Sequence, residues 1–199
     1  MTKRTATVER KTRETSVRLK LNLDGESKTT ISTGVGMLDH LINSLAFHAG
    51  FDCTLECQGD LQVDDHHTVE DCALVLGEAL NSALGERNSI TRFGSEFAPL
   101  DESLSRAVVD LSGRPHATVN LQLTRDRLGE LACENITHFL HSLAMAARLT
   151  LHVDVLRGEN DHHKAEAAFK ATALALRTAI TSGKGPLPST KGTLGGNES

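Results

Sequence analysis

Apolar and polar residues alternate along several short stretches of this chain, and such alternation predicts β-strands that bury one face. From Ser16 to Leu23 every second residue is apolar, and Asp24-Gly25 is a turn signal at the end of that stretch. Residues 6–11 form a weaker alternating partner. Further alternating stretches lie at residues 51–57, 107–111, 118–123 and 149–155. Residues 86–100, with Arg92, Gly94 and Pro99, lack this pattern and are predicted to be a connector.

Other segments place apolar residues at helical spacing. A glycine-rich lead at residues 33–36 precedes an apolar stripe that contains Leu38, Leu41 and Leu45, and residues 139–144 repeat that stripe. Two alanine- and leucine-rich segments follow residues 65–70 and 161–166, and both are predicted to be helices.

The second half of the chain repeats the first. An offset of 98 residues maps Leu41, Ile42, Leu45 and Ala46 onto Phe139, Leu140, Leu143 and Ala144. We therefore predict an α+β fold with two duplicated strand-strand-helix-strand-helix units, each placing helices on one face of a small sheet. The predicted boundaries are 1–88 and 89–182. A tail at 183–199, rich in Gly, Pro, Ser and Lys, is predicted to be flexible and to contact substrate.

The sequence Asp-His-His-x-x-Glu occurs twice, at residues 65–70 and 161–166, each time at the start of a predicted helix. On a helix each Glu shares a face with residues three and four positions earlier, whereas neighbouring His side chains diverge by about 100°. The two His of a pair therefore need not serve the same metal ion. The offset of 98 also maps the lone His40 onto His138.

Imidazole and carboxylate groups together suit Zn, Mn, Fe, Co or Ni. The repeat predicts two equivalent metal ions with open coordination positions, because a closed tetrahedral structural site would need fewer ligands. The predicted metal ligands are His40, His66, His67, Glu70, His138, His162, His163 and Glu166.

Composition narrows the class of protein. The chain has 199 residues and a formal net charge of -5, which argues against a general nucleic-acid partner. No apolar run approaches the length of a membrane span, and residues 1–15 lack the apolar core of a signal peptide. The four Cys form no Cys-x-x-Cys pair, and Cys53 and Cys57 are expected to be buried thiols on the apolar face of a strand. These features favour a cytoplasmic protein that contacts neither membrane nor nucleic acid.

A weaker signal concerns phosphate. Ser189, Thr190 and Lys191 combine hydroxyls and an ammonium group beside a glycine, which suits a phosphate group. Spacing alone favours ordinary surface roles for Arg92, Arg114, Lys170 and Lys191, and it favours an exposed turn carboxylate for Glu14.

Several motifs together closely resemble the imidazoleglycerol-phosphate dehydratase family of histidine biosynthesis. They comprise residues 34–40, 64–71, 110–115, 158–163 with Glu166, Phe169 and Lys170, and 189–192. The resemblance runs from about Arg10 to Leu194 with the motifs in the same order.

The resemblance implies a ribosomal-protein S5 domain 2-like fold, a homo-oligomer of twenty-four subunits built from trimers, and two Mn(II) ions per active site at subunit contacts. It implies dehydration of a phosphorylated imidazole substrate, imidazole-glycerol phosphate, to imidazole-acetol phosphate. It assigns catalysis to Glu14, His67, Glu70, His163 and Glu166. It assigns substrate contacts to Glu14, His48, Arg92, Arg114, Lys170, Ser189, Thr190 and Lys191.

Two other functions stay open at this point. A two-metal phosphoesterase would also need clustered ligands, although such sites usually use Asp bridges and the repeated ligands here are mostly His. A non-catalytic metal-binding assembly protein would need the ligands but would leave the Arg and Ser-Thr-Lys residues without a role.

Overall fold

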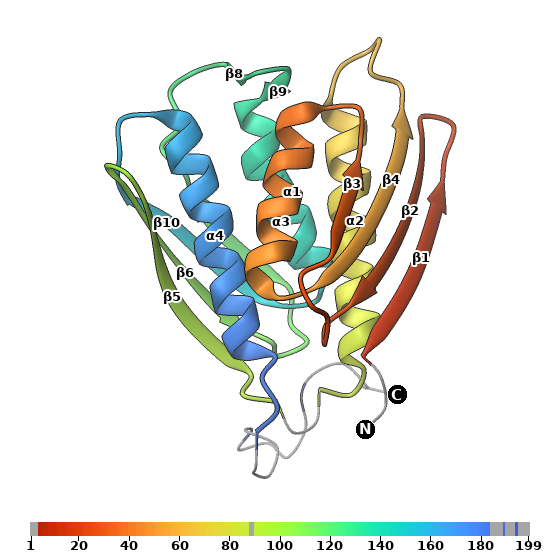
Figure 1. Cartoon of the computed structure of the whole chain (residues 1–199), viewed down its shortest axis with the longest axis vertical. Coiled ribbons are helices and arrows are strands. Elements are labelled where there is room, and N and C mark those ends of the chain that lie inside the picture. Colours follow the sequence, from red (N-terminus) through yellow and green to blue (C-terminus); the bar gives the residue numbers. More distant parts are fainter. Residues whose placement is uncertain (1–3, 88–89, 184–188, 190–193, 195–199) are drawn as a thin grey trace.

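The computed structural model describes residues 4–87, 90–183, 189 and 194 (Figure 1). The first sheet has the order β1-β2-β4-β3, with β1 at Thr5–Lys11, β2 at Thr15–Asn22, β3 at Thr29–Ser32 and β4 at Asp52–Gly59. The second has the order β5-β6-β10-β7, with β5 at Phe93–Leu100, β6 at Ser103–Asp110, β7 at His116–Asn120 and β10 at Thr150–Arg157. A small hairpin joins β8 (Arg127–Leu128) to β9 (Leu131–Ala132).

The four helices described are α1 (Gly36–Ala49), α2 (His66–Leu84), α3 (Cys133–Ala146) and α4 (Asp161–Ala179). Both sheets repeat one topology, in which three antiparallel strands are followed by a parallel edge strand. Leu21 pairs with Cys53 in the first sheet, and Val109 pairs with Leu151 in the second. The predicted duplicated α+β fold is therefore confirmed.

Each four-stranded sheet contains one strand more than the alternation predicted, and the β8–β9 hairpin was not predicted. β3 is a short edge strand, and β5 occupies residues 93–100, so the prediction of a plain connector at 86–100 was wrong. The reason lies in the buried face of β5, which consists of Gly94 and Ala98, while the larger Phe93 and Phe97 are exposed. Small residues face α4 because the backbone of α4 lies close to β5. The sequence of β5 therefore lacks the alternation of large apolar and polar residues that predicts a strand.

The strand predicted at 118–123 is shifted toward the N-terminus. β7 covers His116–Asn120, and Gln122 has a φ of 52°, which takes the chain out of the extended conformation. The Gln122 side chain then donates a hydrogen bond to the carbonyl of Val155 at 2.6 Å. Leu121 is still buried, but it follows the strand instead of belonging to it.

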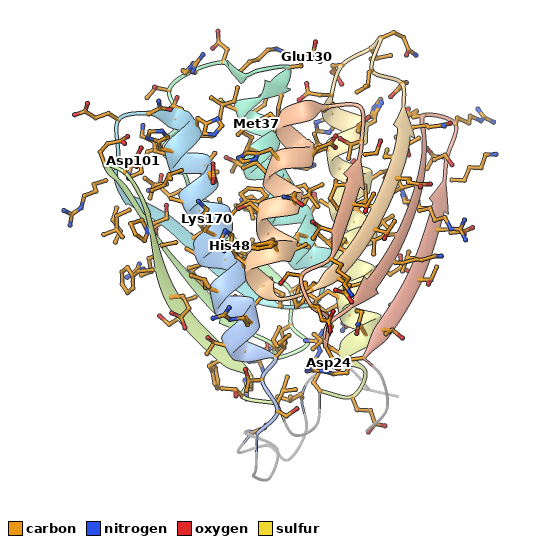
Figure 2. The ribbon with its side chains drawn as sticks, viewed as in Figure 1. Asp24, Met37, His48, Asp101, Glu130 and Lys170 are labelled. Carbon is orange, nitrogen blue, oxygen red and sulfur yellow. The ribbon has the colours of Figure 1, made fainter. Side chains whose placement is uncertain are left out.

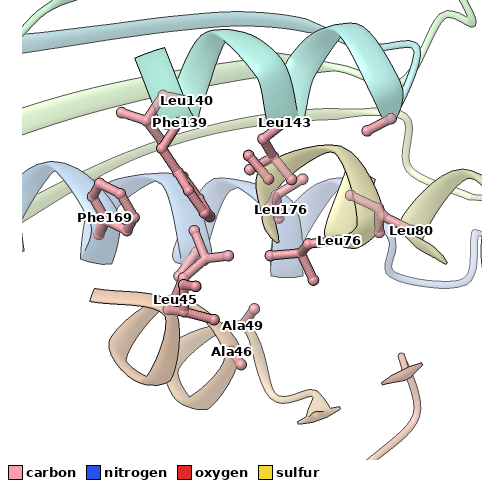
Figure 3. Packing of buried hydrophobic residues seen from close by; sticks show 14 of the residues in the cluster. Leu45, Ala46, Ala49, Leu76, Leu80, Phe139, Leu140, Leu143, Phe169 and Leu176 are labelled. Atoms are coloured by element: carbon pink, nitrogen blue, oxygen red, sulfur yellow. The ribbon is translucent and has the colours of Figure 1, made fainter. Parts of the chain in front are cut away.

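The helices lie between the two sheets and join the halves (Figure 1). α2 packs against α3, and α1 packs against α4, so each contact pairs one helix from each half. Leucine, alanine and phenylalanine side chains from all four helices fill the centre (Figure 3). A Cβ atom at Gly77 would lie 2.7 Å from the Leu143 carbonyl oxygen, so glycine permits the close approach of α2 and α3.

Two expectations are not addressed by these elements. The predicted boundary between residues 88 and 89 and most of the predicted tail at 183–199 lie outside the described residues. Among the helices that the structure describes, none is both long and apolar enough to span a bilayer.

Replacing Gly94 with Ala tests the contact between β5 and α4. The new Cβ atom would lie 1.9 Å from the Ala175 carbonyl oxygen, so strand and helix must separate. We expect the free energy of unfolding to fall by about 1–3 kcal/mol, measured as a lower midpoint of urea denaturation. Ser95→Ala, on the exposed face of the same strand, should leave the midpoint nearly unchanged. Equal midpoints for the two variants would contradict this account.

Candidate metal centres on paired helices

Both His-His pairs lie in the first turn of a helix. The backbone N–H of His66 donates to Asp64 Oδ1 at 2.9 Å, and that of His162 donates to Asn160 Oδ1 at 2.9 Å. These bonds satisfy backbone donors that a helix start leaves without a partner within the helix. These local bonds thus help α2 and α4 to begin at the motifs, which places the His and Glu side chains near the starts of the two helices.

The first cluster contains His40 from α1 with His162 and Glu166 from α4. The Nε2 atoms of His40 and His162 lie 2.9 Å and 3.3 Å from Glu166 Oε2. The two rings stack with centroids 5.4 Å apart. One potential ligand atom from each residue lies within 4.8 Å of the others, which is close enough for one metal ion to contact all three.

The second cluster repeats this arrangement with His66 and Glu70 from α2 and His138 from α3. His138 Nε2 lies 3.3 Å from Glu70 Oε1, and the His66 and His138 rings stack at 4.9 Å. The side-chain oxygen of Asn135 lies 3.0 Å from His66 Nδ1 and orients that ring. Each cluster therefore combines a helix from the first half with a helix from the second.

The structure thus brings together six of the eight predicted ligands, in two groups of three. His67 and His163 lie outside both groups, with their rings nearly perpendicular to those of His66 and His162. This divergence follows from the rotation of about 100° between neighbouring helical residues.

Acidic residues hold these two outer rings. His67 Nδ1 lies 3.1 Å from Asp60 Oδ2, and His163 Nδ1 lies 2.7 Å from Glu102 Oε2. The hydrogen bonds raise the pKa of His67 and the pKa of His163 above the usual range. Sequence reasoning missed Asp60 and Glu102, because neither belongs to a motif and only the fold brings them to the imidazoles.

Glu14 lies in the turn between β1 and β2, with its carboxylate 3.8 Å from His67 Nε2. The turn is fixed by Thr12, whose hydroxyl accepts hydrogen bonds from the backbone N–H groups of Glu14 and Thr15. The Thr15 hydroxyl also donates to Asp71 on α2, which ties the turn to the helix that carries His67. The fold therefore holds an exposed carboxylate beside one outer imidazole.

A cationic side chain adjoins the first cluster. Lys170 Nζ lies 2.6 Å from Glu166 Oε1, and His48 lies beside Lys170 between α1 and α4 (Figure 2). Burial alone would raise the pKa of Glu166, but hydrogen bonds from Lys170 and His40 outweigh it and lower the pKa to about 2. Burial and the Lys170 charge lower the pKa of His48, which favours a neutral imidazole.

The second cluster has apolar residues at the corresponding positions. An offset of 96 maps His66, His67 and Glu70 onto His162, His163 and Glu166. The same offset relates Leu74 to Lys170, and the offset of 98 maps His48 onto Ala146. The two clusters therefore share their potential ligands but differ in their surroundings, and an anionic group would be favoured beside the α1–α4 cluster.

The predicted arginines lie elsewhere in the chain. Arg92 donates to both oxygens of Asp110, at 2.7 Å and 3.0 Å, and its backbone N–H bonds to Ala179 at the end of α4. The candidate ligands on α4, His162 and Glu166, lie near its start, about 20–25 Å away along the helix axis. Arg114 lies near the start of β10, where its carbonyl accepts a hydrogen bond from Thr150. Ser189 belongs to neither cluster, and Thr190 and Lys191 lie outside the described residues.

Fold and clusters together define an internally duplicated α+β protein with two symmetry-related groups of His and Glu side chains. A protein-family model described as Imidazoleglycerol-phosphate dehydratase matches residues 33–176. The chain belongs to the imidazoleglycerol-phosphate dehydratase family.

Individual proteins that are similar to this chain carry the same family name. A protein named imidazoleglycerol-phosphate dehydratase from Phytophthora nicotianae is 58% identical over 96% of this chain, which spans 42% of that longer protein. One of the same name from Maudiozyma humilis is 52% identical over 98% of this chain and 100% of its own length. The Staphylococcus aureus crystal structure superposes with a TM-score of 0.81 at 36% identity, covering 89% of this chain and 99% of that one.

A buried ion pair at the start of α4 supports the motif and can be tested. Lys164 Nζ bonds to Asp161 Oδ1 at 2.9 Å, and both side chains are almost fully buried. Burial alone would raise the pKa of Asp161, but bonds from Lys164 and from the backbone of Arg125 and Thr124 lower it to about 2. The folded-state pKa lies below the ordinary 3.8, so this stabilisation is present above about pH 4 and is lost as the pH falls toward 2.

Asp161→Asn should lower the free energy of unfolding by about 3–5 kcal/mol near neutral pH, because Lys164 loses its buried partner. Its stability should also depend less on pH between about 4 and 2 than that of the unaltered chain. Urea denaturation at several pH values measures both effects. Asp154→Asn removes a more exposed pair with Arg106 and should change stability by about 1 kcal/mol or less. If Asp161→Asn lowered the free energy of unfolding as little as Asp154→Asn does, the proposed role of the buried ion pair would be contradicted.

Proposed function

We propose that this chain dehydrates imidazole-glycerol phosphate to imidazole-acetol phosphate in histidine biosynthesis. The observation that carries the proposal is the pair of matching His/Glu clusters, at the expected motifs, on a chain of the imidazoleglycerol-phosphate dehydratase family. Full-length coverage of relatives such as the Maudiozyma humilis protein supports transfer of the activity.

The chemistry of the donors fits a divalent transition metal. Each cluster offers two imidazoles and one carboxylate, a set that suits Mn(II), and none of its ligand atoms is a thiolate. We propose two Mn(II) ions per active site, held by the six cluster residues together with His67 and His163. When bound, they would hold the substrate ring through its nitrogens and stabilise negative charge there.

The remaining groups would position substrate and move protons. In the overall reaction a hydroxyl leaves the carbon attached to the ring, a proton leaves the neighbouring carbon, and the resulting enol becomes the ketone. Glu14 is the proposed acid or base, because its exposed carboxylate lies beside His67 without belonging to a cluster. Lys170 and His48 would bind the polar part of the substrate, together with Ser189, Thr190 and Lys191.

A second copy of the chain would complete the site. Three candidate ligands per cluster leave positions open, and His67 and His163 lie outside the clusters of their own chain. Arg92 and Arg114 lie at the opposite end of α4 from the clusters, so they could reach a substrate only from another copy. These positions support contacts between copies of the chain, and we propose the assembly of twenty-four subunits built from trimers that the family resemblance implies. The exposed Phe93 and Phe97 on β5 offer apolar area for such contacts.

A cytoplasmic location is also proposed. The four cysteines are free and buried, which suits a reducing compartment.

The other two functions are disfavoured by particular residues. A two-metal phosphoesterase usually bridges its ions with carboxylates, whereas each cluster here contains one Glu and two His. An assembly protein without catalysis would gain nothing from Lys170 and His48 beside the first cluster.

The deciding experiment is a dehydratase assay with imidazole-glycerol phosphate on metal-stripped protein, titrated separately with Mn(II) and Zn(II). Particle size is measured in parallel. Activity restored by Mn(II) in a large particle is the expected result. Assembly with metal but without product would contradict the proposed activity and leave metal with a structural role.

His67→Ala and His163→Ala should each reduce metal content, particle stability and activity together, because one proposed ligand is lost. Metal content is measured by elemental analysis after gel filtration. His141→Ala is the matched control, since His141 belongs to neither cluster, and it should retain the metal content of the unaltered protein. Unaltered metal content in His67→Ala or His163→Ala would exclude that residue as a ligand.

Glu14→Gln should retain metal content and particle size but lose turnover by about 100-fold or more, because the amide cannot exchange the proton. The assay compares kcat with the substrate dissociation constant, and only kcat should fall. Near-normal turnover would remove Glu14 from the proposed mechanism.

A further inference from the structure

Two hairpin carboxylates occupy the same place in the duplicated fold. Glu14 immediately precedes β2, and Glu102 immediately precedes β6, its counterpart in the second sheet. An offset of 88 residues relates them, as it relates the paired strands β2 and β6. Each turn lies beside the second His of the nearby motif, yet the two carboxylates make different contacts.

Glu102 is fully engaged by its own half. Its Oε1 accepts backbone hydrogen bonds from Asn160 at 2.9 Å and Glu159 at 3.1 Å. Its Oε2 lies 2.7 Å from His163 Nδ1. A carboxylate can only accept here, so this ring carries its proton on Nδ1 and keeps the Nε2 lone pair for a ligand.

In the first half another residue holds the imidazole. Asp60, in the link between β4 and α2, lies 3.1 Å from His67 Nδ1, and its side chain is largely buried. The corresponding link before α4 is two residues shorter and contains Gly158 instead of an acidic side chain at the equivalent of Asp60. Glu14 therefore makes no bond to His67 Nδ1, and its carboxylate lies 3.8 Å from Nε2, on the side where a ligand would bind.

We propose that the duplicated hairpin carboxylates have diverged into two roles. Glu102 is a positioning residue that orients His163 and fixes its tautomer. Asp60 has taken over that task for His67, which leaves Glu14 free to face the substrate. The inference rests on the proposed function, because it assumes that the outer imidazoles bind metal through Nε2.

Glu102→Gln is a sharp test because the two oxygens have separate partners. The backbone N–H groups of Glu159 and Asn160 retain the amide oxygen, so the amide NH₂ must face His163 Nδ1. That nitrogen then accepts, the proton moves to Nε2, and the lone pair for a metal is lost. Both side-chain oxygens of Asp60 face His67 Nδ1, so an amide at this position could still offer its oxygen to the ring. Asp60→Ala is therefore the suitable change at His67.

The measurement is the affinity of full-length, metal-stripped protein for Mn(II), with free Mn(II) followed by electron paramagnetic resonance. We expect Glu102→Gln and Asp60→Ala each to bind about 10–100-fold more weakly at the affected site. Glu14→Gln, the positional counterpart of Glu102→Gln, should bind as the unaltered protein does. Asp101→Asn is a neighbouring control: the exposed Asp101 carboxylate lies 3.8 Å from His163 Nε2, as Glu14 does at His67, and Nδ1 is held by Glu102, so this variant should also bind Mn(II) as the unaltered protein does.

A double variant separates positioning from a general structural effect. If Glu102 acts through His163, adding Glu102→Gln to His163→Ala should weaken Mn(II) binding no further. Additive losses, or unaltered affinity in Glu102→Gln and Asp60→Ala, would overturn the inference while leaving the proposed function intact. Failure of the unaltered protein to bind Mn(II) would overturn the metal assignment itself. Thermal unfolding of the metal-free variants, expected near that of the unaltered chain, shows that each one folds.

Discussion

The close packing of helices from opposite halves is the contact on which the rest of the structure depends. α1 lies against α4 and α2 against α3, and neither His/Glu cluster exists without its pair. Such contacts need small residues, and a Cβ atom at Gly77 would already crowd Leu143 and Ala146. The core between the sheets therefore also sets the distance between imidazoles on neighbouring helices.

Local sequence was sufficient for the repeat and the start of each motif helix, because hydrophobic period and motif spacing are local properties. It was not sufficient for β5, whose buried Gly94 and Ala98 give no apolar alternation. Helical geometry indicated that His66 and His67 would diverge, but a helical face does not reveal its partner. Tertiary packing determines that α2 contacts α3. It also brings Asp60 to the ring of His67 and Glu102 to the ring of His163.

The two clusters combine symmetric ligands with asymmetric surroundings. Lys170 places a positive charge beside one cluster, with His48 next to it, whereas Leu74 and Ala146 occupy the matching positions beside the other. The proposed substrate, with an imidazole ring and a phosphate, would have the same combination, since the ring presents two similar nitrogens and the phosphate lies to one side. On the proposed function, one repeated motif would thus serve an asymmetric reactant.

Helix pairing across the halves has a consequence for the history of the molecule. If each half had been a separate identical chain, two copies placed like these halves would form both clusters, and every substitution would appear at both. Covalent fusion removes that constraint, because each half can then mutate alone. A difference in sequence such as Lys170 against Leu74, or in contacts as for Glu14 and Glu102, is one that two identical separate chains would not show in a symmetric pair.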